Sequence, residues 1–310
     1  MKLYANLAGV DVGDGFPVRI VGAINVSPES FYAGSVAGSR RALQRRAARM
    51  EAEGADIIDL GAMSTAPYRR GAIDEAEELR RMAAAVRAVR QAVRVPISAD
   101  TQRSRVAAAA LAAGAAIIND VSGLGHDAAM GAVARDFGGV ILMATEQGPS
   151  RQAPLKMIAA LLRACLRRAR RARIAADHIV LDPGIGFFRR ARVPWFELDC
   201  VVLRDLQRLR RLGHPVLIGV SRKSFIGKLT GRADPGARLA GSLAATAIAV
   251  ANGAALVRTH DVAATLDAVR VAMAMRKAAP ERRGDAATRR RGAGGAVGPD
   301  PALTRRRPAV

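Results

Sequence analysis

Ten polar or charged side chains stand where short apolar runs of the sequence end, and their types could do chemistry together. Carboxylates and amides can hydrogen-bond the ring nitrogens and amino groups of a polar heterocycle, whereas cations bind phosphate oxygens. The set therefore predicts one site for a ligand that carries both a polar heterocycle and an anionic group. The ten are Asn25, Asp59, Asp100, Asn119, Asp182, Ser221, Arg222, Lys223, Arg258 and His260.

Two members of this set have an informative sequence context. Asp182 ends an apolar run, and the proline and glycines that follow prevent a strand or helix from continuing, so a buried strand is expected to deliver its carboxylate. Lys223 is one of five lysines among the 49 basic residues, which suggests that a compact ammonium is needed there. Taken singly, each aspartate could instead cap a helix, Lys223 could be a solvated lysine and His260 a structural histidine.

The elements that must position these residues alternate regularly along the chain. Eight apolar runs, each followed by a helix-like segment, predict eight strand–helix units. Eight such units favour a (β/α)8 barrel, in which the carboxyl ends of the strands share one mouth. An open doubly wound sheet is the alternative, but no GxGxxG motif follows the first run. The expected strands are 18–25, 55–60, 95–100, 115–120, 139–144, 179–182, 215–220 and 254–260, and the longer expected helices are 40–53, 74–93, 155–173, 196–212, 238–252 and 263–278.

The composition changes near the end of the chain. From residue 280 onward the sequence is rich in Arg, Gly, Ala and Pro and contains almost no large apolar side chains. Such a segment buries too little surface to order itself. We therefore predict a barrel domain over residues 1–279 and a disordered basic tail over residues 280–310.

Charge and composition narrow the class of protein. The formal net charge of +22 could indicate nucleic-acid binding, but the arginines are scattered and no basic motif with interleaved aromatic residues accompanies them, so no nucleic-acid partner is expected. No apolar stretch has the length of a membrane span or signal peptide. Two cysteines without metal-ligand spacing suit a reducing compartment. A cytoplasmic protein without a membrane partner is expected.

Eight segments of this chain together resemble the dihydropteroate synthase family. They follow the family's order between Val18 and Val271, and jointly they are very specific, although a piece such as ISADT alone would be weak. The resemblance implies a barrel enzyme, expected to be a homodimer, that joins 6-hydroxymethyl-7,8-dihydropterin diphosphate to an arylamine and releases pyrophosphate. The segments are NVSPESF from Asn25, DLGAMST from Asp59, ISADT from Ile97, IINDVSG from Ile117, LDPGIGF from Leu181, GVSRKSFIG from Gly219, GSLAATAIA from Gly241 and VRTHDV from Val257.

The resemblance also implies a role for individual residues. Asn25, Arg258 and His260 would hold the diphosphate, Asn25 would also face a Mg²⁺ ion, and Thr65 and Ser224 would lie on the arylamine side. Arg258, His260 and Lys223 would be the catalytic residues, because cations must stabilise the departing anion. The pterin would be bound by Asp100, Asn119, Met143, Asp182, Phe187, Lys223 and Arg258.

The chain departs from the family's pattern in three loops. Ala33 replaces an expected aspartate, Met63 an expected glutamate, and Ala66 an expected arginine, while Met143–Thr145 reads MAT instead of MHM. The pterin residues are intact, so we expect pterin diphosphate to bind and the acceptor site to differ. The acceptor could be 4-aminobenzoate or a larger derivative such as the ribofuranosylaminobenzene phosphate of tetrahydromethanopterin synthesis.

Two alternatives from other classes remain open at the level of sequence. A non-catalytic pterin-binding paralogue, or a partner subunit of a true synthase, would keep the pterin residues and lose the loop charges. A pterin-dependent methyltransferase domain shares the barrel, but it has less reason to keep the SRKSFIG segment from Ser221 and the pair Arg258 and His260.

Overall fold

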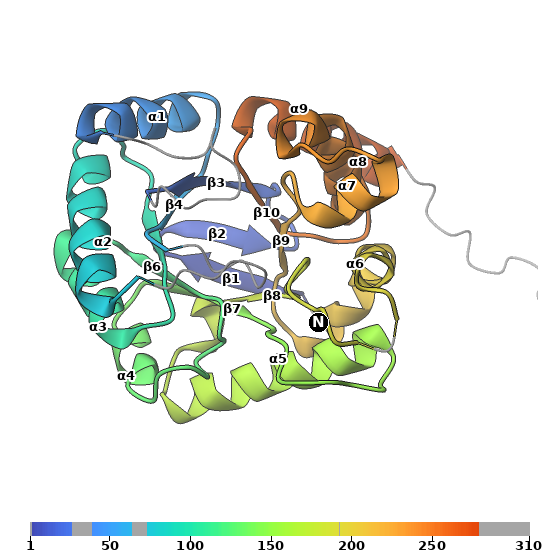
Figure 1. The fold of residues 1–310 in the computed structure, drawn as a ribbon, viewed down its shortest axis with the longest axis horizontal. Helices are drawn as coiled ribbons and strands as arrows, with labels where there is room; N and C mark the ends of the chain where they lie inside the picture. The colour runs from blue at the N-terminus through green and yellow to red at the C-terminus, as the bar shows by residue number, and fades with distance from the viewer. Residues whose placement is uncertain (1, 27–38, 64–72, 192, 279–310) are drawn as a thin grey trace, which may run out of the picture. The chain divides into compact units, whose positions relative to one another are not determined.

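Eight parallel strands form the barrel that the sequence predicts (Figure 1). The computed structural model describes residues 2–26, 39–63, 73–191 and 193–278. The strands follow one another around the barrel in the order β8, β7, β6, β5, β4, β3, β10, β9. The ring closes between β8 and β9, where Leu181 pairs with Val216 and the Leu181 N–H donates to the Pro215 carbonyl at 3.0 Å. The strands are β3 (Arg19–Asn25), β4 (Ile57–Gly61), β5 (Ile97–Asp100), β6 (Ile117–Asp120), β7 (Gly139–Met143), β8 (Ile179–Asp182), β9 (Leu217–Gly219) and β10 (Leu256–Thr259).

Helices surround the barrel, and several begin where the sequence predicts. Ser39 caps the first helix by accepting the Ala42 N–H at 3.2 Å, and Asp74 caps the second by accepting the Glu77 N–H at 2.7 Å. The helices are α1 (Arg40–Ala52), α2 (Glu75–Arg90), α3 (Ser104–Ala113), α4 (Met130–Ala134), α5 (Pro154–Arg171), α6 (Trp195–Arg204), α7 (Ser224–Thr230), α8 (Leu239–Ala251) and α9 (Val262–Ala278), with the short 3-10 helices η2 (Ala176–His178), η3 (Leu206–Leu212) and η4 (Pro235–Arg238).

One predicted helix is in fact two elements. The segment 196–212 was expected to be continuous, but the backbone leaves the helical conformation at Asp205 (φ −104°, ψ 19°), where α6 ends and η3 begins. The Asp205 carboxylate hydrogen-bonds the Arg204 guanidinium at the break. The segment contains no proline or glycine that would have marked this break in the sequence.

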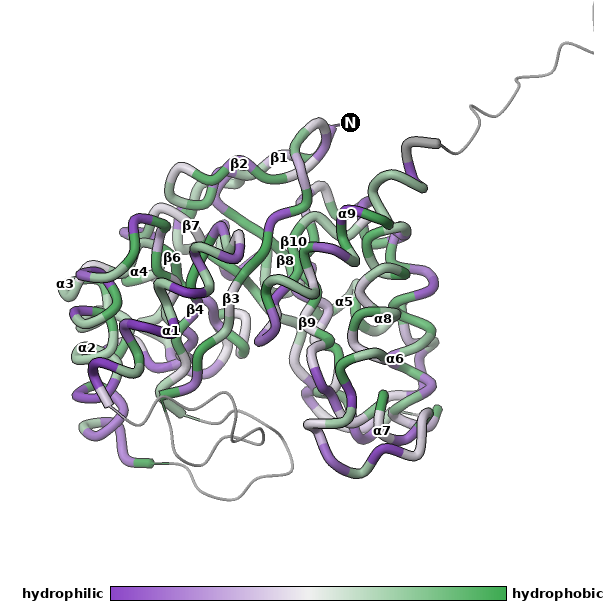
Figure 2. Tube along the Cα trace, turned by 90° about the horizontal axis from the view of Figure 1, so that it is seen from above, coloured by the Kyte–Doolittle hydropathy of each residue, from purple (hydrophilic) through white to green (hydrophobic). Residues whose placement is uncertain are grey.

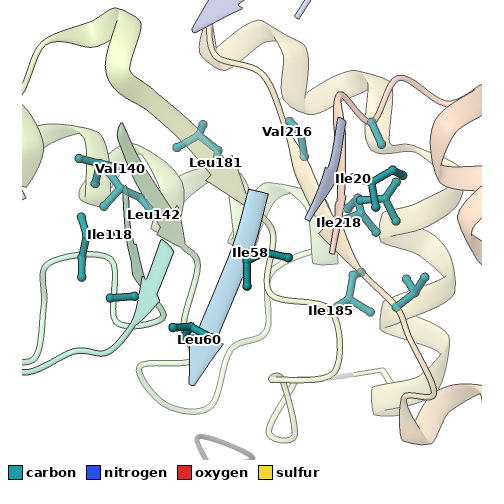
Figure 3. Close-up of a cluster of buried hydrophobic side chains, with 14 of the residues drawn as sticks. Ile20, Ile58, Leu60, Ile118, Val140, Leu142, Leu181, Ile185, Val216 and Ile218 are labelled. Atoms are coloured by element: carbon teal, nitrogen blue, oxygen red, sulfur yellow. The ribbon is translucent and has the colours of Figure 1, made fainter. Parts of the chain in front are cut away.

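Alternate residues of each strand face the helices or the barrel interior. Ile58 and Leu60 of β4 and Leu181 of β8 belong to the large apolar core between strands and helices (Figure 3). Ile57, their inward-facing neighbour, belongs to a separate apolar cluster inside the barrel. The strands are therefore buried on both faces, as expected of a parallel sheet.

A β-hairpin that the sequence analysis did not predict covers the amino-terminal end of the barrel. It is formed by β1 (Tyr4–Leu7) and β2 (Val10–Gly13), with Ala8 and Gly9 at positive φ in the turn. Figure 2 shows the hairpin at the end of the barrel opposite to α7. Its side chains Ala5, Leu7 and Val12 pack into the inner apolar cluster. The strands are short and the turn lacks the usual Asn-Gly or Asp-Gly pair, so the sequence signal was weak.

The predicted boundary between residues 279 and 280 and the predicted disordered tail lie outside the described residues. Within the described ranges, no helix combines the length and hydropathy needed to cross a membrane.

Candidate active site at the barrel mouth

The mouth of the barrel arises from the alternation of side chains along the strands. Two residues beyond Ile57, on the same inward face of β4, lies Asp59, which is fully buried. In the same way Asn119 lies two residues beyond Ile117 on β6, and Arg258 lies two residues beyond Leu256 on β10. The apolar layer near the hairpin thus gives way to a polar layer at the carboxyl ends of the strands.

Arg258 is the centre of this polar layer. Its Nε donates to Asp59 Oδ2 at 2.6 Å, and its Nη2 donates to Asp100 Oδ2 at 3.1 Å. Asn119 Nδ2 donates to the same Asp59 oxygen at 3.3 Å. One guanidinium therefore joins side chains from β4, β5 and β10, and an amide from β6 completes the network.

The protonation of this network follows from its burial. Burial works against the charge of Arg258, but Asp59 and Asp100 together outweigh it and raise the pKa of Arg258 above its usual value. Burial raises the pKa of Asp100 to about 7, although Arg258 acts in the opposite direction. Asp100 can therefore gain or lose a proton near neutral pH.

Two carboxylate oxygens of the network point to a ligand. Asp59 Oδ1 and Asp100 Oδ1 are buried and have no hydrogen-bond partner among the described residues. A buried acceptor without a donor is costly, so such atoms are expected to meet a ligand or a water molecule. They are suited to a ligand with N–H groups on a planar edge.

Lys223 lies beside the turn that follows β8. Its Nζ donates to the Ile185 carbonyl and lies 5.0 Å from the centroid of the Phe187 ring. Burial lowers the pKa of Lys223 to about 8, and Asp182 acts in the opposite direction. Burial likewise raises the pKa of Asp182, whose Oδ1 accepts the Gly184 N–H at 2.7 Å. Met143, predicted to line this pocket, is buried at the end of β7 and is the register partner of Asp182.

The side chains predicted to hold the diphosphate also meet. His260 follows β10, and its Nδ1 lies 3.1 Å from Ser221 Oγ, while its Nε2 lies 3.5 Å from Asn25 Nδ2. Burial and the positive charge of Arg258 lower the pKa of His260 to about 3. The imidazole is therefore neutral near pH 7 without a ligand.

The predicted arylamine side is only partly described. Ser224, the first residue of α7, accepts from Arg189 Nη2 at 3.1 Å, and the Arg189 guanidinium stacks 4.1 Å above the centroid of the Trp195 ring. Thr65, Ala33 and Ala66 lie outside the described residues. Met63 is half-buried just beyond β4.

A Mg²⁺ ion fits the donors present only if the substrate supplies most of its ligands. Among the described residues, no group of three or more His, Cys, Asp or Glu side chains is arranged to hold a metal. Mg²⁺ commonly takes one or two protein oxygens together with phosphates and waters. A side chain at Gly61 would lie 3.3 Å from Asn25 Oδ1 and 3.8 Å from Asp100 Oδ2, so the glycine leaves room beside the Asn25 amide oxygen.

One residue expected at the mouth has a different function. Arg222 is 5% exposed and forms two hydrogen bonds to the Asp261 carboxylate, at 2.9 and 2.8 Å. It also donates to the carbonyls of Pro235 and Gly236. Arg222, which has a positive φ of 55°, therefore links η4 to the loop after β10 through these hydrogen bonds.

Two side chains near the mouth, Arg189 and Asp199, are missing from the predicted site. Asp59 belongs to the predicted set, but the resemblance implies no role for it, although its inward position two residues after Ile57 is a usable signal. Asp199 lies on α6, and its Oδ1 accepts the Gly186 N–H at 2.8 Å.

Comparison with known proteins agrees with this geometry. Residues 21–260 match the family model described as pterin binding enzyme. The dihydropteroate synthase of Synechocystis sp. is 38% identical over 264 residues, covering 83% of this chain and 89% of that protein. The Escherichia coli K12 enzyme of the same name is 34% identical over 290 residues, covering 91% and 99%.

Solved structures give the same result. The Xanthomonas albilineans dihydropteroate synthase with 4-aminobenzoic acid has a TM-score of 0.79 at 36% identity, covering 90% of this chain and 100% of that one. The Burkholderia cenocepacia enzyme complexed with 7,8-dihydropteroate has a TM-score of 0.76 at 34% identity, covering 90% and 99%. The protein is thus a pterin-binding barrel enzyme by fold and site. Within that class, the chain belongs to the dihydropteroate synthase family.

Proposed function

We propose that this protein condenses 6-hydroxymethyl-7,8-dihydropterin diphosphate with an arylamine and releases pyrophosphate. The observation that carries the proposal is the Arg258 network, which includes Asn119 and two buried carboxylate oxygens that have no hydrogen-bond partner in the described part of the chain. The relatives named above support the same reaction, because two of them were solved with 4-aminobenzoic acid and with 7,8-dihydropteroate.

The heterocycle would bind across the polar layer. Asp100 and Asp182 would accept hydrogen bonds from the ring N–H and amino groups, and Asn119 can both donate and accept. Lys223 would donate to a ring acceptor. Met143 and Phe187 would supply the apolar contacts, and Arg258 would stack against the ring.

The reaction exchanges one bond for another at the methylene carbon of the pterin. The arylamine nitrogen forms a bond to this carbon, the bond from carbon to the diphosphate oxygen breaks, and the amine proton is lost to solvent. An arylamine is already a nucleophile, so the protein needs no covalent intermediate. Its main task is to stabilise the departing anion, for which Arg258, His260 and Asn25 are suited. When bound, Mg²⁺ would neutralise diphosphate charge.

The arylamine would bind beside Ser224. The Ser224 hydroxyl, the Arg189 guanidinium and the nearby Lys223 ammonium make this side favourable for an acceptor with an anionic substituent. Both 4-aminobenzoate and a larger arylamine phosphate satisfy that requirement. The changes at Ala33, Met63 and Ala66 remove charges that the family's pattern places in the neighbouring loops, and they support an acceptor site that differs from the family's usual one.

A homodimer and a cytoplasmic location complete the proposal. Ile248 on α8 and Val271 on α9 are 52% and 54% exposed, and a second copy that covered these two helices would bury both side chains. Cys165 and Cys200 are both free thiols, which suits a reducing compartment. Sedimentation velocity of the purified protein tests the dimer.

The experiment that tests the function is a comparison of acceptors. Purified protein is incubated with the pterin diphosphate, Mg²⁺ and either 4-aminobenzoate or ribofuranosylaminobenzene phosphate, and pyrophosphate and the pterin product are measured. Product with either acceptor supports the synthase. Faster turnover with 4-aminobenzoate would contradict the remodelled acceptor site. Pterin binding without pyrophosphate release from any arylamine would favour a non-catalytic paralogue.

A further inference from the structure

A buried carboxylate on α6, that of Asp199, contacts the turn after β8 and has no role in the reaction described above. Its side chain is 1% exposed. Oδ1 accepts the Gly186 N–H at 2.8 Å, whereas Oδ2 is buried and has no hydrogen-bond partner among the described residues. Because a partly satisfied buried carboxylate is costly, its presence calls for a functional explanation.

The peptide that Asp199 holds lies directly against Lys223. Gly186 has a φ of +82°, and a Cβ at this position would lie 3.1 Å from Lys223 Cδ. The preceding residue, Ile185, supplies the carbonyl that accepts from Lys223 Nζ, and the following residue, Phe187, supplies the ring 5.0 Å from the same nitrogen. A movement of Gly186 would therefore displace both groups that surround the ammonium.

Two carboxylates hold this turn from opposite sides. Asp182 binds its first half through the Gly184 N–H at 2.7 Å, and Asp199 binds its second half through Gly186. Asp182 belongs to the barrel, whereas Asp199 belongs to the helix layer. The turn is thus fixed between the two layers of the fold.

The charge of Asp199 also acts on Lys223. The charged groups that face Lys223 are Asp182 from β8, Asp199 from α6, Arg258 from β10 and Arg189 from the loop after β8. Burial raises the pKa of Asp199 to about 6, and the Gly186 N–H, Lys223 and Arg189 act in the opposite direction. Asp199 is therefore mostly ionised at pH 7 and helps to keep Lys223 protonated.

We propose that Asp199 is a positioning residue for pterin binding, which holds Gly186 so that the Ile185 carbonyl and the Phe187 ring stay in place around the Lys223 ammonium. The inference rests on the proposed pterin site. It assigns to α6 a part in that site, although Asp199 itself touches no substrate.

Three variants of the full chain test this inference. Asp199→Ala removes the acceptor of the Gly186 N–H, and Asp199→Asn keeps an oxygen acceptor but removes the charge. Asp205→Asn is the matched control, since Asp205 ends the same helix and pairs with the exposed Arg204. Circular dichroism and thermal melts establish that each variant is folded. Titration calorimetry with pterin diphosphate and Mg²⁺, together with steady-state kinetics, gives the Kd, both KM values and kcat.

The expected result is a selective loss of pterin affinity. In Asp199→Ala the Kd and KM for pterin diphosphate should rise about tenfold, while the KM for the arylamine stays unchanged. In the control variant Asp205→Asn all of these constants should match the wild type. Asp199→Asn should keep the affinity within about threefold at pH 7. Its alkaline decline in kcat/KM should begin at lower pH than in the wild type, because Lys223 has lost a negative neighbour.

Two results would overturn the inference. One is an Asp199→Ala variant that binds pterin diphosphate as tightly as the wild type. The other is an Asp199→Asn variant that binds pterin diphosphate as weakly as Asp199→Ala, or one whose kcat/KM declines at the same alkaline pH as that of the wild type. If Asp199→Ala fails to fold, the pH profile of Asp199→Asn decides alone. A wild-type protein that fails to bind pterin diphosphate would instead contradict the proposed function.

Discussion

The two ends of the barrel are built from the same strands, yet they differ completely in chemistry. Near the hairpin, Ile57 and Leu256 belong to an apolar layer sealed by Leu7 of β1. Two residues further along the same strands, Asp59 and Arg258 form an ion pair in which the carboxylate is fully buried and the arginine is 22% exposed. A shift of two residues, about 7 Å along a strand, thus separates a layer that stabilises the fold from a layer that binds a ligand.

The comparison teaches that burial alone does not define function here. Asp59 in the polar layer is as buried as Ile57 in the apolar layer, since each is 0% exposed. Burial of the apolar layer stabilises the fold. Burial of the polar layer costs free energy, because two of its carboxylate oxygens have no hydrogen-bond partner among the residues that the structure describes. Substitutions in the apolar layer should therefore change stability, and substitutions in the polar layer should change turnover and ligand affinity.

The largest effect is expected from Arg258→Met. The substitution leaves Asp59 and Asp100 buried without their cation, and it removes a group proposed to stabilise the leaving diphosphate. We expect kcat/KM to fall by about 10³ and the free energy of unfolding to fall by about 3–5 kcal/mol. Turnover assays and urea denaturation measure the two quantities. Near-normal turnover would show that the polar layer is not the reaction site.

At the opposite end, Ile57→Ala should affect stability alone. The side chain is fully buried, so its loss leaves a cavity and should cost about 2–5 kcal/mol of unfolding free energy. The Kd for pterin diphosphate, measured at a temperature where the variant is folded, should match the wild type. A large loss of affinity would indicate that the two layers are coupled, contrary to the comparison.

An effect of comparable size, but one that depends on pH, is expected from Asp100→Asn. The pKa of Asp100 is about 7 in the folded protein against 3.8 as its ordinary value, so the native state holds the proton more strongly between these values. Stability of the wild type relative to the variant should therefore fall as pH rises from about 4 to 7 and then level off, by on the order of 1 kcal/mol per pH unit.

Urea denaturation of wild type and Asp100→Asn at pH 5, 6, 7 and 8 measures this difference. A difference that does not depend on pH would show that the Asp100 carboxyl ionises in the native state as it does in the unfolded chain.

The smallest effect is expected from Arg19→Met at the amino-terminal end of β3. Arg19 also pairs with a carboxylate, Asp56 at 3.0 Å, but both side chains are about a quarter exposed (23% and 26%). The pair should contribute only about 0–1 kcal/mol, and turnover should be unchanged. A loss of stability and turnover comparable to that of Arg258→Met would mean that the contribution of an ion pair does not depend on its position in the barrel.

The sequence predicted the barrel and most of the mouth because both depend on short-range pattern. Each strand is a brief apolar run that ends in a polar residue, as with Asp182, and the topology then brings those ends together. The resemblance to a known family supplied the roles of residues such as Asn119 and Lys223, which spacing alone could not give.

What was missed depends on contacts distant in sequence or on backbone conformation. Arg222 is expected at the mouth because it stands where an apolar run ends, but its partner Asp261 lies 39 residues away and its φ is positive. Asp199 looks like any acidic residue on a helix, and nothing local shows that it binds Gly186. The inward face of Asp59 could have been deduced from Ile57, since period-two alternation relates them.

The central claim is that the polar layer of the barrel binds the pterin ring. A crystal structure of the protein with pterin diphosphate and Mg²⁺ tests it most directly. We predict that the ring edge lies within hydrogen-bond distance of Asp100, Asn119 and Asp182, with the diphosphate at Arg258 and His260. A pterin bound elsewhere on the chain, with Asp59 Oδ1 and Asp100 Oδ1 still without a ligand, would contradict the account.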